Sequence, residues 1–195
     1  MNNYKKNLDL LTRNHVYSKE MEHDACGVGL IASTEGKKSR SVVEYGIEAL
    51  KAVWHRGAVD ADGKTGDGAG IHVEIPKDFF IEKIEVTGHD YDNSEICVGM
   101  IFLPKNDYSS QENCKTIVES ELTKNNLSIY GRRQVPVNPK ILGEKALQTM
   151  PEIIQVLFKS NDPNLLDKNL ERKIYETRKR IENKAFDASL NNFYF

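Results

Sequence analysis

Cys26 is the residue whose type and setting most directly suggest chemistry. It opens the run Cys-Gly-Val-Gly-Leu-Ile-Ala at 26–32, directly after a polar stretch. The apolar residues of this run predict a covered strand, and its two glycines let a ligand or a second backbone approach closely. A thiolate at the edge of such a strand could act as a nucleophile. A single cysteine on an apolar strand is otherwise a common core residue, so the nucleophile hypothesis needs further support.

Two more blocks follow along the chain. His55-Arg56-Gly57 falls at or just past the end of an expected helix, where an arginine can reach a pocket. A glycine-rich loop comes next, at 62–70. It lacks the ending of a phosphate loop, and Lys64 and Thr65 stand where a calcium loop needs an oxygen ligand and a turn glycine. We expect this loop either to serve backbone conformation near a site or to be a surface turn.

Together these blocks resemble the class II glutamine amidotransferase domain of the glutamate synthases. The segment at 75–80 is similar to the family's Ile-Pro-x-x-Phe-Phe block, and 131–137 is similar to its Gly-Trp-Arg-x-Val-Pro-Val block. Arg132 takes the place of the family's tryptophan, which leaves the local packing there open. Other class II amidotransferases typically have a block similar to His-Arg-Gly-Pro-Asp, whereas this chain has His-Arg-Gly-Ala. We therefore favour resemblance to the glutamate synthases.

The resemblance implies a fold and a division of the chain. The fold is the four-layer αββα fold of N-terminal-nucleophile hydrolases, an α+β fold that we expect to be incomplete at the C-terminus. Periodicity alone supports only α/β or α+β. Residues 1–25 are expected to be a leader or propeptide without a structural element of its own, and 26–195 the N-terminal part of the amidotransferase domain.

The resemblance also implies the roles of three site residues. Cys26 is the catalytic nucleophile that cuts glutamine, and removal of the leader would free its α-amino group as the base. Arg56 and Gly57 line the pocket, with Arg56 helping to hold Cys26; an ordinary ion pair at a helix end is the alternative for Arg56. The family's oxyanion hole and its clamp for glutamine lie beyond position 195. We therefore expect the 195-residue piece alone to be nearly inactive.

The implied function is the glutaminase part of glutamate synthase, an oxidoreductase that makes glutamate from glutamine and 2-oxoglutarate. L-glutamine is the expected substrate, and the synthase domains of the same chain and a small reductase subunit are the expected partners. FMN and an iron–sulfur cluster are implied for the full-length enzyme, with no cofactor in this segment. The electron donor, whether NADPH, NADH or ferredoxin, stays open.

Composition narrows the classes of protein. The chain has 195 residues, of which 39% are hydrophobic and 29% charged, as expected of one globular domain. Its formal net charge of -2 argues against nucleic acid as a partner. The sequence contains no apolar stretch of the roughly 20 residues that a membrane-spanning helix needs, so we expect a cytoplasmic protein. Cys97 is predicted to lie in the core and Cys114 has no assignable role; the cysteine spacing predicts neither a disulfide nor a metal site.

The secondary structure follows from hydrophobic period and capping signals. Ser41 and Glu44 have capping-box spacing, and Asp162-Pro163 has the pattern of a helix start. Besides the strand after Cys26, we expect strands at 71–75, 95–103, 127–137 and 153–158, a strand beginning at 193–195, and helices at 41–54, 110–125 and from 162 to about 183.

Two hypotheses compete with the amidotransferase. The domain could be a non-catalytic structural module in which Cys26 is a core residue. The basic run within 171–182 could bind nucleic acid, but acidic residues are interspersed, which favours a solvated helix face.

Overall fold

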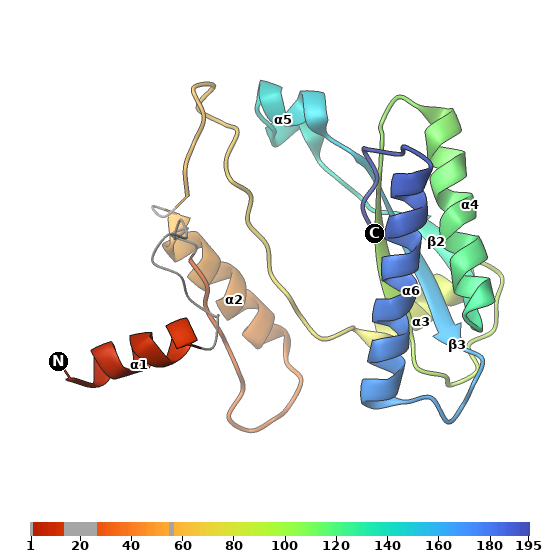
Figure 1. Cartoon of the computed structure of the whole chain (residues 1–195), viewed down its shortest axis with the longest axis horizontal. Coiled ribbons are helices and arrows are strands. Elements are labelled where there is room, and N and C mark those ends of the chain that lie inside the picture. The colour runs from red at the N-terminus through yellow and green to blue at the C-terminus, as the bar shows by residue number, and fades with distance from the viewer. Residues whose placement is uncertain (1, 14–26, 55–56) are drawn as a thin grey trace. The chain divides into compact units, whose positions relative to one another are not determined.

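The computed structural model describes residues 2–13, 27–54 and 57–195. These residues divide into two compact units (Figure 1). The helical unit comprises Met1–Ala58 and Gly66–Ile71, and the sheet unit comprises Val59–Thr65 and His72–Phe195. The boundary between them therefore falls inside the glycine-rich loop.

The described residues of the sheet unit form a three-stranded antiparallel sheet. Its strands are β1 (Cys97–Leu103), β2 (Leu127–Gln134) and β3 (Glu152–Ser160), and β3 lies in the centre between the other two. The register pairs Ile101 with Ile154, and the ladder of β2 is irregular between Ile129 and Gly131. The sequence of β3 is mainly apolar between Ile153 and Phe158, with Gln155 as the exception.

Helices cover both faces of this sheet. Val156 and Phe158 of β3 belong to one apolar cluster, whereas Leu157 between them belongs to another. Successive side chains of a strand point to opposite faces. The first cluster includes residues of α4 (Tyr108–Lys124) and α6 (Asp167–Asp187), which lie side by side in Figure 1, and the second includes residues of α3 (Lys77–Val86). The unit also contains the short helices η2 (Pro139–Ile141) and α5 (Glu144–Thr149).

Most sequence predictions for the sheet unit are confirmed. β1, β2 and β3 form where strands were expected, and α4 occupies the helix expected over 110–125. Cys97 is a core residue with 5% of its surface exposed. The last helix begins later than predicted, because Asp162 closes a turn by accepting the amide of Asn164 and α6 starts only at Asp167.

The helical unit contains α1 (Asn2–Arg13) and α2 (Arg40–Ala52). Helix α2 was expected, but its N-cap is Ser39, whose hydroxyl oxygen accepts the amide of Ser41 at 3.1 Å. Helix α2 itself has no buried residue. Helix α1 corrects the expectation that 1–25 lacks a structural element. Its lysines, leucines and arginine favour a helix locally.

Two predicted strands are wrong. Residues 27–33 have no regular structure, and Val28 and Leu30 expose 94% and 90% of their surface. Residues 71–75 are likewise irregular, with Ile71 and Val73 exposed. A strand needs a neighbour that accepts its hydrogen bonds, and within the described ranges neither segment pairs with another strand.

The expected strand beginning at 193–195 is confirmed at one residue. Tyr194 pairs antiparallel with Phe102, whose amide donates to the Tyr194 carbonyl at 2.8 Å while the Tyr194 amide donates back at 3.1 Å. This places Tyr194 on the outer edge of β1.

Among the described helices, none has the length and hydropathy required to cross a bilayer.

Candidate functional site

The structure describes one of the three predicted site residues. Cys26 and Arg56 lie outside the described residues, and Gly57 lies inside them. The Gly57 amide donates to the carbonyl oxygen of Trp54 at 3.0 Å, and a Cβ added at Gly57 would lie 3.4 Å from that same oxygen. Gly57 therefore lies just past the end of α2 at Ala52, where the sequence placed it.

The second half of the glycine-rich loop contacts this turn. The Ala58 amide donates to Asp67 Oδ2 at 2.8 Å. A Cβ added at Gly66 would lie 3.4 Å from the Ala58 carbonyl oxygen, and Gly68 has a φ of +86° that favours glycine. The positive φ of Gly68 and the close approach at Gly66 are backbone features that the glycines of this loop allow, whichever of the two expected roles the loop has. Through Asp67, the loop is also hydrogen-bonded to Ala58, which follows Gly57.

The first half of the loop belongs to the sheet unit and has its own anchor. The Asp62 carboxylate accepts the amides of Lys64 and Thr65 and the Thr65 hydroxyl, at 2.9, 2.7 and 2.6 Å. These hydrogen bonds hold the pKa of Asp62 well below its usual range. The bond from the Thr65 hydroxyl has the largest effect, and those from the two amides add to it. Asp60 pairs with Lys145 of α5 at 2.6 Å. The Asp62 carboxylate therefore serves the loop's own structure, and Asp60 links the segment before the loop to α5.

The two described cysteines lack the properties of a nucleophile. Cys97 and Cys114 are free thiols, and both are buried. Burial, with smaller effects from Glu95 and Glu171, raises the pKa of the Cys97 thiol to about 12. Burial likewise raises the pKa of Cys114. Because the thiolate is the reactive form, neither side chain suits attack on an amide.

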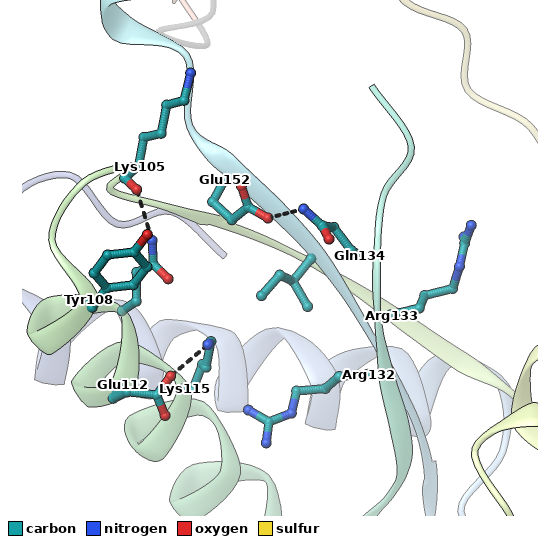
Figure 2. Close-up of a pocket in the computed structure, with 10 residues that line it drawn as sticks. Lys105, Tyr108, Glu112, Lys115, Arg132, Arg133, Gln134 and Glu152 are labelled. Atoms are coloured by element: carbon teal, nitrogen blue, oxygen red, sulfur yellow. Dashed lines mark hydrogen bonds and ion pairs between the residues drawn. The ribbon is translucent and has the colours of Figure 1, made fainter. Parts of the chain in front are cut away.

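An open groove of about 640 Å³ lies on the sheet unit (Figure 2). Its charges largely have partners: Lys115 pairs with Glu112 at 2.7 Å, and Gln134 donates to Glu152. None of the ten lining residues is a cysteine, serine, threonine or histidine, so the groove offers no usual nucleophile for amide cleavage. The lining residues are Lys105, Tyr108, Gln111, Glu112, Lys115, Arg132, Arg133, Gln134, Glu152 and Ile154.

Arg132, which replaces the tryptophan of the family's block, contributes to that groove. Its guanidinium pairs with Glu119 of α4 at 2.5 Å, so the substitution is accommodated by an ion pair between β2 and α4.

The ion pairs of α6 bear on the nucleic-acid hypothesis, because Arg172, Arg178 and Lys179 all pair with glutamates of the same helix. Such pairs are typical of a solvated helix face. In the part of the chain that the structure describes, no cluster of His, Cys, Asp or Glu could hold a metal ion.

Comparison with known proteins identifies the class. Residues 26–195 match the family model of the class-II glutamine amidotransferases. The chain therefore belongs to that family, as the sequence resemblance predicted. The match begins at Cys26 itself.

The relatives are glutamate synthases. The chain is 51% identical over 191 residues to the glutamate synthase [NADPH] large chain of Azospirillum brasilense, covering 98% of this chain and 12% of the relative. It is 41% identical over 162 residues to ferredoxin-dependent glutamate synthase 1 of Arabidopsis thaliana, covering 83% and 10%. It is 36% identical over 193 residues to the glutamate synthase [NADH] of Saccharomyces cerevisiae, covering 91% and 9%. The chain thus spans about a tenth of these relatives' length, and their names support glutamate synthase over other class II amidotransferases.

Proposed function

We propose that this chain carries the glutaminase step of a glutamate synthase. The match to the class-II amidotransferase model, which starts at Cys26, carries the proposal. The thiols of Cys97 and Cys114 support it by contrast, because burial makes both unsuitable as nucleophiles. In this proposal Cys26 is the catalytic residue, and Arg56 and Gly57 line its pocket.

The proposed chemistry uses the freed N-terminus. Residues 1–25 form a propeptide whose removal exposes the α-amino group of Cys26, and 26–195 form part of the amidotransferase domain. The amine takes the thiol proton; reference pKa values of about 8.5 and roughly 7.7–8.0 make this transfer cost on the order of 1 kcal/mol. The thiolate attacks the side-chain carbonyl carbon of glutamine, and ammonia leaves with the amine's proton. Water then cleaves the γ-glutamyl thioester and releases glutamate.

We further propose the four-layer αββα fold for the complete domain. The exposed apolar residues at 27–31 and the pairing of Tyr194 with the outer edge of β1 support it. Both features suit strands that gain neighbours when the sheet is extended. The described sheet, covered by α4 and α6 on one face and α3 on the other, would then be one part of that fold.

The remaining features belong to the full-length enzyme. The ammonia would pass to synthase domains of the same chain, which aminate 2-oxoglutarate and hold FMN and an iron–sulfur cluster. A small reductase subunit and a cytoplasmic location are part of the same proposal. The names of the relatives include NADPH, NADH and ferredoxin, so similarity in this region does not select the electron donor.

The test is a glutaminase assay of the full-length protein, with Cys26→Ala as the variant and Cys97→Ala as its matched control. We expect ammonia release from glutamine to fall to background in Cys26→Ala, because this variant lacks the proposed attacking thiol. Cys97→Ala should retain activity, since Cys97 is a core residue of β1. Glutaminase activity that survives Cys26→Ala would contradict the proposal.

A further inference from the structure

We propose that Asp67 is a positioning residue of the glutaminase site, acting through the backbone of Gly57 and Ala58. This inference rests on the proposed function. Gly57 is the predicted pocket residue that the structure describes, and Asp67 holds the peptide group that follows it. Asp67 has no expected contact with the reacting atoms, so its effect would come from the placement of that backbone.

Two consecutive amides fix this backbone. The Gly57 amide donates back to the Trp54 carbonyl at 3.0 Å, and the Ala58 amide donates forward to the Asp67 carboxylate at 2.8 Å. The first bond joins the turn to the end of α2, and the second joins it to the glycine-rich loop. The acceptor of the second bond is a side-chain oxygen, so this bond depends on the side chain at position 67. The pocket segment is therefore held from both sides.

The residues around Asp67 explain why the contact forms. Gly66 has no side chain, and a Cβ there would already lie 3.4 Å from the Ala58 carbonyl oxygen. Gly68 adopts a positive φ of +86°, a conformation that other residues adopt only with strain. The Gly-Asp-Gly sequence therefore lets the loop approach Ala58 closely and turn away again. The aspartate between the two glycines supplies the acceptor.

Loss of this contact should affect catalysis more than folding. All buried residues of the described chain lie between Phe80 and Ala185, so Asp67 contributes nothing to that core. A displacement of about 1 Å in a catalytic site can cost on the order of 10²-fold in rate. We therefore expect the turnover number to respond while the stability of the sheet unit stays constant.

The experiment compares three variants of the full-length enzyme in the glutaminase reaction. Asp67→Ala removes the acceptor, and Asp67→Asn keeps an acceptor oxygen. Asp60→Ala removes a carboxylate that lies just before the loop and pairs with Lys145 instead. We expect kcat to fall by about 10- to 100-fold in Asp67→Ala, with a smaller change in KM. Asp67→Asn should return kcat to within a few-fold of wild type, and Asp60→Ala should match wild type. The thermal unfolding of Asp67→Ala should follow that of the wild-type enzyme.

Three results would overturn the assignment. The first is a wild-type kcat in Asp67→Ala, and the second is a loss that Asp67→Asn fails to reverse, since an amide oxygen can accept the same hydrogen bond. The third is a loss of equal size in Asp60→Ala, which would point to general loop damage. A wild-type enzyme without glutaminase activity would instead contradict the proposed function itself, so the two failures are distinguishable.

Discussion

The sheet unit and the helical unit bury their apolar side chains very differently. In the sheet unit, Ile101, Val118 and Phe158 come from β1, α4 and β3 and expose 1% of their surface or less. In the helical unit, α2 has no buried residue, and Trp54 exposes 77% of its surface. The sheet unit thus makes its own core. The helical unit contains the predicted nucleophile in its sequence range, and none of its described apolar residues belongs to the buried core.

This difference in burial indicates that the two units are stabilised in different ways. Self-contained packing stabilises the sheet unit through long-range contacts among β1, β3 and α4. The backbone around Gly57 is instead held by local hydrogen bonds to Trp54 and Asp67. Segments with few buried contacts occupy the low-stability end of a protein, which is where binding and catalytic loops are usually found. The predictions below test this contrast between the two units.

The largest expected effect comes from truncating equivalent side chains in the two units. Ile101→Ala should cost about 2–5 kcal/mol of unfolding free energy, because it leaves a cavity in a fully buried site. Ile47→Ala in α2 should cost about 1 kcal/mol or less, since Ile47 is only half-buried. Urea unfolding followed by far-ultraviolet circular dichroism measures both. Equal losses of unfolding free energy in Ile101→Ala and Ile47→Ala would contradict the contrast in burial between the two units.

An added methyl group should have opposite effects at two glycines. A Cβ at Gly131 would lie 2.5 Å from Cγ2 of Thr87, whose hydroxyl also donates to the Tyr130 carbonyl, so Gly131→Ala should destabilise by about 1–3 kcal/mol. A Cβ at Gly46 meets nothing within 4 Å inside α2. Gly46→Ala should therefore stabilise that helix by about 0.5–1 kcal/mol. Thermal unfolding of the two variants provides the comparison, and a stable Gly131→Ala would contradict the close packing of β2 against the end of α3.

The smallest effect concerns a polar cluster of the sheet unit. Lys159, and then the Tyr130 hydroxyl, hold the pKa of Asp92 well below its usual range. A depressed pKa means that the cluster stabilises the fold above the unfolded-state value of about 3.9 and loses that contribution as the pH falls below it. Asp92→Asn should remove this part of the acid sensitivity. Asp90→Asn is the matched control, and unfolding scans between pH 7 and pH 3 measure the difference; identical acid sensitivity in Asp92→Asn and wild type would refute the role of Asp92.

The sequence predicts the sheet unit well because its signals are local. The apolar runs of β1 and β3 and the helical period of α4 bury against each other within the described chain, so pattern and environment agree. The run after Cys26 carries the same apolar signal but has no strand beside it among the described residues, so the pattern alone predicted a strand wrongly. The start of α6 was misplaced because Asp162 closes a turn with Asn164.

The candidate site was only partly predictable. The roles of Cys26, Arg56 and Gly57 came from resemblance to a family, since residue spacing by itself favoured a core cysteine at position 26 and a simple ion pair at Arg56. Asp67 was seen only as part of a glycine-rich loop. Its contact with Ala58 spans nine positions and depends on the turn at Gly57, so no periodic signal in the sequence marks it.

The most direct test of the central claim is the N-terminus of the full-length gene product, determined by intact mass and terminal sequencing after native expression. The account predicts a mature chain that starts at Cys26 in the wild type, because only a freed α-amino group can take the thiol proton of that residue. A Cys26→Ala variant serves as the control for processing. An enzyme that hydrolyses glutamine while still beginning at Met1 would contradict the proposed N-terminal nucleophile.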